Sequence, residues 1–309
     1  MIYSLNTEEM AQLYERISKE FETYGTVDIQ GDITFSRIES YDELRIGRSD
    51  KPPKEFLIGR NENVLVFTEP NKKAVFGVMS CDLKGFYIMD KQIYGKDPFY
   101  TARRDNTVFI NYVCTEPCET GFCSSFGGPL LNDYQIQVIN YENDKYLIYA
   151  DDAYKSFFEG FKQASKEEIS KVEKLMHNFN MKQKKHEVEG IENRIKWNSK
   201  LWDEYAKICI QCGACNYSCP TCYCFDLNDV GEERIREWDS CILAGFTKTS
   251  AGNPRESLAS RLRQRFYHKF VYYKKSKGEY LCTGCNRCTD DCPVDIEIKE
   301  VIDHDYNNE

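Results

Sequence analysis

Two short stretches decide how this chain is interpreted: CIQCGACNYSCP at residues 209–220 and CTGCNRCTDDCP at residues 282–293. Each has the spacing C-x2-C-x2-C-x3-C followed by proline, the run that holds [4Fe–4S] clusters in bacterial ferredoxins. The two-residue gaps let a tight loop direct three thiolates at one cube. The fourth cysteine begins to leave the loop, and the proline helps to turn the chain away. The sequence therefore predicts two [4Fe–4S] clusters.

The ligands of the two clusters are expected to be exchanged between the runs, because in two-cluster ferredoxins the fourth cysteine of each run ligates the other cluster. The first cluster is predicted on Cys209, Cys212, Cys215 and Cys292. The second cluster is predicted on Cys282, Cys285, Cys288 and Cys219. A pair of zinc knuckles is the alternative, since four-thiolate zinc sites also use C-x2-C pairs, but zinc does not need a third cysteine at a two-residue gap.

Seven further cysteines lie outside the two runs. Four of them lie in the N-terminal half, near expected strand ends and Gly-rich turns: Cys81, Cys114, Cys118 and Cys123. These four could hold a third iron–sulfur cluster, and buried free thiols are the alternative. Three more lie in the C-terminal half: Cys222, Cys224 and Cys241. This trio could hold a cluster with a donor from elsewhere, or it could stay reduced and empty.

Composition and charge exclude several classes of protein. Among 309 residues, 41 are Lys or Arg and 50 are Asp or Glu, so the formal charge is −9. This acidity argues against nucleic-acid binding, which needs a clustered cationic face. No apolar run approaches the ~18 residues of a membrane span, and no signal peptide is visible, so we expect a cytoplasmic protein. In a reducing compartment, 15 cysteines indicate metal ligation rather than disulfides.

Hydrophobic periodicity predicts an α/β domain over residues 1–152. Residues 7–24 and 83–94 have the apolar spacing of helices, and residues 134–150 have two alternating arms typical of a hairpin. Short apolar or β-branched runs predict further strands at residues 64–67, 74–79 and 107–113.

The rest of the chain has a different character. Residues 153–200 are rich in Lys, Glu and Asn and predict a helical connector with a solvated face. Residues 201–309 carry both cysteine runs, and residues 234–241 and 256–273 between them are compatible with helices. The expected fold class is α+β: an N-terminal α/β domain followed by a mostly α-helical, two-cluster ferredoxin-type domain.

Several cations between the two runs raise a question of local charge, because a cube with four thiolates is negatively charged. Arg261 and Arg265 share a helix face, while Arg263 points elsewhere. We expect either a solvated face with carboxylate partners or arginines that line the clusters. In the second case, replacing Arg261 or Arg265 with Gln lowers a cluster potential.

The order of the motifs resembles a known family. The tract CIQCGACNYSCPTCYCFDLNDV (209–230) is followed by REWDSC (236–241), NPRESLASRLRQRFYHKFVYY (253–273) and CTGCNRCTDDCPVDIEI (282–298). Together they closely resemble the iron–sulfur beta subunit of cytosolic nickel–iron sulfhydrogenases. They are also similar to the iron–sulfur electron-transfer subunit of anaerobic sulfite reductases.

The N-terminal half shares this resemblance, with one departure. FGVMSCDLKGFYIMDKQIYGKDPFYTARR (76–104) and VCTEPCETGFCSSFGGP (113–129) are similar to the family's Cys-Asp-Leu segment and Cys-rich turn. The family's turn usually has Cys-Phe-Cys where this chain has Gly121, Phe122 and Cys123. The nearest spare thiol is Cys118. A cluster at this turn would therefore have moved or lost one ligand.

The resemblance implies an electron-transfer subunit of a soluble, hetero-oligomeric oxidoreductase of anaerobic metabolism. Its implied partners are a catalytic metallo-subunit, with the hydrogenase type favoured, and a flavin/NAD(P)-binding reductase subunit. The same role in an anaerobic sulfite reductase is the alternative. No G-x-G-x-x-G follows a strand and no P-loop is present, so substrate chemistry is expected in another chain rather than in a stand-alone enzyme.

Overall fold

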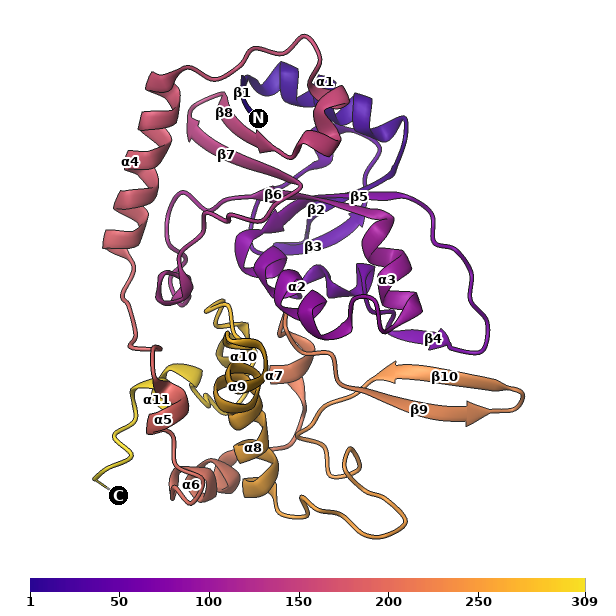
Figure 1. Ribbon diagram of the computed structural model, residues 1–309, viewed down its shortest axis with the longest axis vertical. Helices are drawn as coiled ribbons and strands as arrows, with labels where there is room; N and C mark the ends of the chain where they lie inside the picture. The colour runs from indigo at the N-terminus through magenta and orange to yellow at the C-terminus, as the bar shows by residue number, and fades with distance from the viewer. Residues whose placement is uncertain (309) are drawn as a thin grey trace.

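A mixed seven-stranded sheet organises the N-terminal half in the computed structural model, which describes residues 1–308 (Figure 1). The strand order is β1-β8-β7-β6-β5-β2-β3, and β2, β5, β6 and β7 run parallel to one another. All six residues of β6 are buried, as expected for a central strand covered on both faces. The strands are β1 (Ile2–Leu5), β2 (Glu22–Ile29), β3 (Asp32–Arg37), β5 (Lys73–Met79), β6 (Thr107–Tyr112), β7 (Ile136–Glu142) and β8 (Lys145–Ala150).

Helices cover both faces of this sheet. On one face, α1 (Thr7–Ser18) begins with a capping box between Asn6 and Glu9 and buries its apolar side against the sheet. On the other face, Phe86 of α2 packs against Phe109 of β6, with ring centroids 5.0 Å apart. The helices on this second face are α2 (Ser80–Ile93), α3 (Pro98–Asp105) and α4 (Lys166–Lys182).

Short helices and loops make up most of the C-terminal half, around a core that includes the stacked rings of Trp202 and Phe266. A π-helical turn at His268–Tyr272 joins two of these helices. The helices are α5 (Ile191–Arg194), α6 (Leu201–Ile208), α7 (Ala214–Tyr217), α8 (Leu258–Tyr267), α9 (Tyr273–Lys277), α10 (Arg287–Asp290) and α11 (Ile298–Asp303). Together with the sheet, they confirm the predicted α+β class.

A second, three-stranded sheet links the two halves. Strands β9 (Phe225–Val230) and β10 (Glu233–Trp238) form a hairpin that projects from the molecule in Figure 1. The third strand is β4 (Asn61–Asn63), which comes from the N-terminal half and pairs with β10. This sheet crosses from the first predicted segment to the third. The division at residues 1–152, 153–200 and 201–309 remains a proposal.

Three local expectations were wrong. The helix predicted over residues 7–24 ends at Ser18, because the β-branched and aromatic residues that follow favour strand β2. Residues 64–67 are not a strand: the Asn63 side chain accepts the Leu65 N–H at 3.0 Å and turns the chain out of the sheet. Residues 234–241 contain strand β10 rather than a helix, because pairing with β4 and β9 overrides local propensity.

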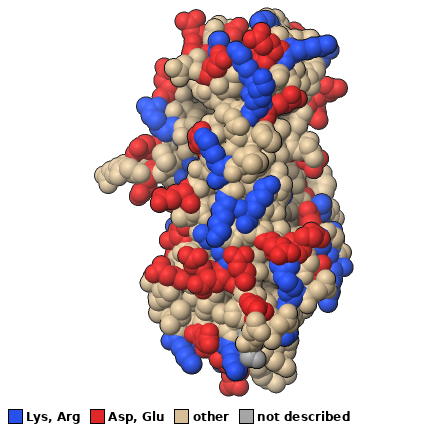
Figure 2. All heavy atoms as spheres, turned by 90° about the vertical axis from the view of Figure 1, so that its left-hand side faces the viewer, with Lys and Arg blue, Asp and Glu red and all other residues tan. Residues whose placement is uncertain are grey.

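The connector is more than a solvated face. Val172 and Met176 of α4 are buried against Ile139 and Leu147 of the sheet. Figure 2 shows the side of the molecule on which α4 lies, where basic and acidic side chains are interspersed. Within residues 1–308, no helix combines the length and the apolar character that crossing a membrane requires.

Candidate metal centre

The two cysteine runs fold into loops with the same backbone signature. In the first loop, Gln211 and Gly213 have φ of +59° and +77°, and in the second loop, the equivalent Gly284 and Asn286 have φ of +71° and +63°. The left-handed region is open to glycine and tolerated by few other residues. Each loop then enters a one-turn helix, α7 or α10, and the two helices contact each other. The duplicated sequence therefore gives a duplicated structure.

Backbone N–H groups in both loops are directed at sulfur. The Gln211 N–H donates to the Cys209 sulfur, and the Gly284 N–H donates to the Cys282 sulfur. The Ile296 N–H also donates to Cys292 Sγ at 3.4 Å. Such bonds stabilise negative charge on a thiolate.

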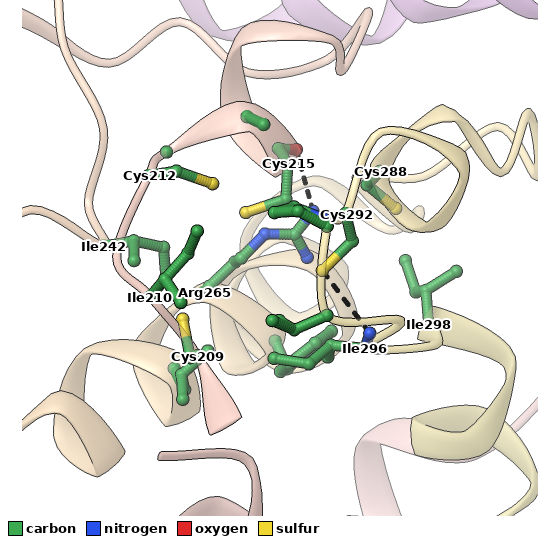
Figure 3. A pocket seen from close by; sticks show the side chains of 16 residues that line it. Cys209, Ile210, Cys212, Cys215, Ile242, Arg265, Cys288, Cys292, Ile296 and Ile298 are labelled. Atoms are coloured by element: carbon green, nitrogen blue, oxygen red, sulfur yellow. Dashed lines mark hydrogen bonds between the residues drawn. The ribbon is translucent and has the colours of Figure 1, made fainter. Parts of the chain in front are cut away.

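The first cavity gathers the four cysteines predicted for the first cluster: Cys209, Cys212, Cys215 and Cys292. Figure 3 shows their sulfur atoms turned toward a common space, with Arg265 behind them and isoleucines around them. The cavity has a volume of about 480 Å³ including its opening to solvent. Cys212 is exposed, and Ile210 beside it is 60% exposed, so one side of this cavity lies at the molecular surface.

The second cavity gathers the four cysteines predicted for the second cluster: Cys219, Cys282, Cys285 and Cys288. All four are buried, in contrast to the first set. Cys288 lines both cavities, so the two spaces share a wall. The structure thus brings together each predicted set of four, including the fourth cysteine that each run lends to the other.

Buried positive charge surrounds these cavities. Arg265 lines the first and Lys269 lines the second, and they are only 3% and 2% exposed. Neither cation has a carboxylate within salt-bridge distance in the described part of the chain. An unpaired buried charge is costly, so the fold is suited to negative charge in the cavities. A cubane with four thiolates supplies such charge.

Lys269 contacts the sulfur of the second set directly. Its Nζ donates to Cys219 Sγ at 3.1 Å, to Thr221 Oγ1 at 3.2 Å and to the Leu281 carbonyl at 3.1 Å. A hydrogen bond with Cys222, together with the Lys269 charge, holds the pKa of Cys219 well below its ordinary value, although burial opposes this. Cys219 is therefore prepared to act as a thiolate.

A second buried lysine comes from the N-terminal half. Lys54 Nζ donates to three backbone carbonyls, those of Asn216, Cys219 and Cys222, at 3.0, 3.1 and 3.0 Å. Burial lowers the pKa of Lys54. These bonds tie the segment after the first cysteine run to a residue far away in the sequence, and they fix the direction in which Cys219 leaves its loop.

One unpartnered polar atom also fits an occupied second cavity. Thr283 lines this cavity and is 2% exposed, and its hydroxyl has no hydrogen-bond partner among the described residues. A buried hydroxyl without a partner costs free energy. Inorganic sulfide or thiolate would accept its proton, so the donor set suits an iron–sulfur cluster.

A third cavity gathers the four N-terminal cysteines: Cys81, Cys114, Cys118 and Cys123. Cys285 lines it too, so it adjoins the second cavity. A buried ion pair lies beside Cys81, in which Arg287 Nη1 and Nη2 donate to the Asp82 carboxylate at 2.6 and 3.0 Å, and Nη1 is 4.0 Å from Cys81 Sγ. Burial raises the pKa of the Cys114 thiol to about 11 and that of the Cys123 thiol to about 12. Metal binding would have to displace these protons.

The remaining trio lies at the base of the β9–β10 hairpin. The Asp239 N–H donates to the Cys224 carbonyl at 3.0 Å, which brings Cys224 near Cys241. The Asn216 side chain donates to Cys241 Sγ at 3.1 Å. A hydrogen bond from Cys224, and then that from Asn216, lower the pKa of Cys241 to about 6. Cys222 instead shares a hydrogen bond with Cys219.

The expectation of a solvated arginine face was wrong for Arg261 and Arg265, which are both buried. Arg265 lines the first cavity, whereas Arg261 holds the loop from outside by donating to the Gln211 side chain at 2.6 Å. Sequence reasoning missed Lys54 and the Asp82–Arg287 pair. Asp82 lies in the Cys-Asp-Leu segment, but no local pattern pairs it with Arg287 or places Lys54, because their positions follow from contacts between the halves.

The comparisons with known proteins agree with this geometry. Residues 208–296 match the model of a 4Fe-4S dicluster domain. Sulfhydrogenase 2 subunit beta of Pyrococcus furiosus is 29% identical, over 97% of this chain and 96% of that protein. The F420-dependent formate dehydrogenase subunit beta of Methanocaldococcus jannaschii is 28% identical over 49% of this chain and 34% of that protein. The resemblance to sulfhydrogenase beta subunits is thus confirmed, and the chain is an iron–sulfur electron-transfer protein.

Proposed function

We propose that this chain relays electrons between a catalytic metallo-subunit of the hydrogenase type and a flavin/NAD(P)-binding reductase subunit. Similarity along nearly the whole chain to a sulfhydrogenase subunit supports the hydrogenase type over the sulfite reductase alternative. The formate dehydrogenase subunit is matched over half of this chain, which supports a shared electron-transfer part rather than a shared substrate.

We assign the first cluster to Cys209, Cys212, Cys215 and Cys292, and the second to Cys282, Cys285, Cys288 and Cys219. The observation that carries this proposal is the pair of four-thiol cavities with a shared wall at Cys288. Each is lined by a buried cation that has no carboxylate partner within residues 1–308. When bound, such clusters exchange single electrons.

The residues of the chain give the two positions different roles. Exposed Cys212 puts the first position within reach of a docked partner, while the buried second position is shielded from solvent. Lys269 and Arg265 offset the negative charge of the thiolates. In both loops, a backbone N–H group donates a hydrogen bond to a cysteine sulfur and keeps its proton. The arrangement suits electron transfer and leaves substrate chemistry to another chain.

The proposal extends to a third cluster in the N-terminal half and to the cytoplasm as its location. The four cysteines of the third cavity support the first extension. The second extension is supported by 15 cysteines in one chain with no disulfide between them, since disulfides rarely persist in a reducing compartment.

Anaerobic affinity purification of the full chain from its native cells tests the proposal. We expect at least about eight irons and eight sulfides per chain, the content of two cubes, with paramagnetism after dithionite reduction. We also expect a flavoprotein and a nickel-containing subunit to copurify. Sirohaem in place of nickel would favour the sulfite reductase alternative.

Two results would contradict the proposal. A colourless preparation that contains zinc and shows no paramagnetic signal after reduction would refute the assignment of both cysteine runs. Iron–sulfur clusters in a chain that copurifies with no redox partner would refute the relay.

A further inference from the structure

The cysteines of the third cavity come from two segments of the N-terminal half, the start of α2 and the stretch that follows β6. Cys81 lies in the first turn of α2, Cys114 follows β6, Cys118 lies in the next loop, and Cys123 begins a short 3-10 helix at Cys123–Phe126. The cavity has a volume of about 420 Å³ including its opening to solvent. Four thiols from two parts of the sequence, position 81 and positions 114–123, therefore converge on one space.

Gly121 makes room for one of these thiols. A Cβ added at Gly121 would lie 2.4 Å from Cys118 Sγ, a separation that real Cβ atoms do not reach. Gly121 does not have a positive φ, so its backbone conformation does not require glycine. Its requirement is steric, because the Cys118 sulfur occupies the space into which a side chain at position 121 would point.

A free donor lies beside this sulfur. Gln183 is 6% exposed, its Oε1 accepts the Ser124 N–H at 2.7 Å, and its Nε2 has no partner among residues 1–308. This Nε2 lies 3.9 Å from the position that a Cβ at Gly121 would take, and Cys118 Sγ lies 2.4 Å from the same position. An amide N–H with no partner at the edge of a sulfur-lined cavity fits a further acceptor, such as inorganic sulfide or a thiolate.

Positive charge adjoins the cavity on its inner side. Arg48 lines the cavity and donates to the Cys285 carbonyl at 2.7 Å, which links this wall to the second cysteine run. The Arg287 guanidinium lies 4.0 Å from Cys81 Sγ. Arg48 pairs with Asp290, and Arg287 pairs with Asp82. The two arginines therefore fix the position of this wall and add little net charge to it.

We propose that Cys81, Cys114, Cys118 and Cys123 bind a third iron–sulfur cluster, and that Cys118 occupies the ligand position that a thiol at residue 121 would otherwise fill. The inference deepens the proposed function and rests on it, since it adds a third redox centre to the same chain. The four thiols release their protons to solvent when they bind iron. Cys285, which lines both cavities, places the third centre next to the second.

The test compares full-length variants prepared anaerobically, with iron and sulfide counted per chain and paramagnetic spectra recorded after reduction. We expect about twelve irons in the unaltered chain and about eight in Cys118→Ser. The double variant Cys118→Ala/Gly121→Cys should recover about twelve, because it removes the obstructing atom at position 118 and supplies the thiol from position 121. Gly121→Ala keeps Cys118 but displaces its sulfur, so it should also lose the third cluster. Gly245→Ala is the matched control, since Gly245 has open space around it and should keep every cluster.

The failures are distinguishable. About eight irons in both the unaltered chain and Cys118→Ser would overturn the third cluster and leave the two-cluster relay standing. An iron count unchanged by Cys118→Ser from about twelve would overturn the role of Cys118. Loss in Cys118→Ser without recovery in the double variant would overturn the equivalence of positions 118 and 121. A chain without iron would refute the proposed function itself.

Discussion

The two cysteine loops share their backbone but differ in their surroundings. Both have two left-handed residues at equivalent positions, and both are followed by a one-turn helix. The first loop reaches the surface at Cys212. The second is covered by the N-terminal half, where the Phe122 N–H donates to the Gly284 carbonyl at 2.8 Å. Local sequence therefore fixes how each loop holds sulfur, and distant segments decide which loop meets solvent.

Substituting the one left-handed glycine of each loop should separate the two loops most strongly. These glycines occupy different positions, because Gly284 is the equivalent of Gln211 and Gly213 is the equivalent of Asn286. A Cβ at Gly284 would lie 2.7 Å from the Phe122 carbonyl oxygen, whereas one at Gly213 would meet side chains of Tyr217 and Ser240. We expect Gly284→Ala to lower the free energy of unfolding by about 3–5 kcal/mol and Gly213→Ala by about 1–3 kcal/mol. The difference arises because the side chains near Gly213 can move aside, whereas the backbone near Gly284 cannot. Thermal melting and iron content of the anaerobic proteins measure the difference. Equal losses would show that burial of the second loop has no energetic weight.

The buried cations allow a sharper comparison, because each lines one cavity. Arg265→Gln should lower the reduction potential of the first cluster, and Lys269→Gln that of the second, since each loses positive charge beside thiolate. We expect shifts of about 60 mV, the one-electron equivalent of a tenfold change. Potentiometric titration followed by paramagnetic resonance measures both clusters in one sample.

Arg263→Gln is the control for this pair. Arg263 lies on the same helix but stacks on Trp197, 3.8 Å from the ring centroid, away from both cavities. Its variant should leave both potentials unchanged. Equal shifts of both clusters in Arg265→Gln and Lys269→Gln would contradict the separate assignment of the two cations.

A change far from both loops should alter stability alone and by the smallest amount. Ser165 and Ser4 donate to the Glu168 carboxylate and lower its pKa from 4.5 to about 2. A lowered folded pKa stabilises the protein above pH 4.5, and this contribution disappears as the pH falls toward about 2. Glu168→Gln should cost about 1 kcal/mol at neutral pH. Melting curves of the apoprotein against pH test this, and any shift of a cluster potential would count against it.

The spacing of the cysteines predicted which of them lie together. Cys209 and Cys292 lie far apart in the chain, yet the exchange rule of two-cluster ferredoxins brought them to one cavity, as the structure has them. The central strands β5 and β6 were also predictable, because a continuous apolar run has few other solutions.

Contacts between distant segments account for what was missed. Strand β10 contains charged residues that are compatible with a helix, and it becomes a strand because β4 and β9 pair with it. Lys54 carries no sequence signal, since its three acceptors are backbone carbonyls and any residue type has one. The Asp82–Arg287 pair likewise joins two residues that neither periodicity nor spacing connects.

The position of Lys54 also orders events during synthesis. Its last acceptor is the carbonyl of Cys222, which is synthesised long after Lys54. At ordinary elongation rates, the ribosome needs roughly ten to thirty seconds to add the residues between them. The Lys54 ammonium cannot be buried before then. Until then, the short 3-10 helix at Pro53–Phe56 lacks the hydrogen bonds that Lys54 makes in the folded protein. The large sheet can therefore mature early, whereas closure of the junction waits for the first cysteine run to emerge.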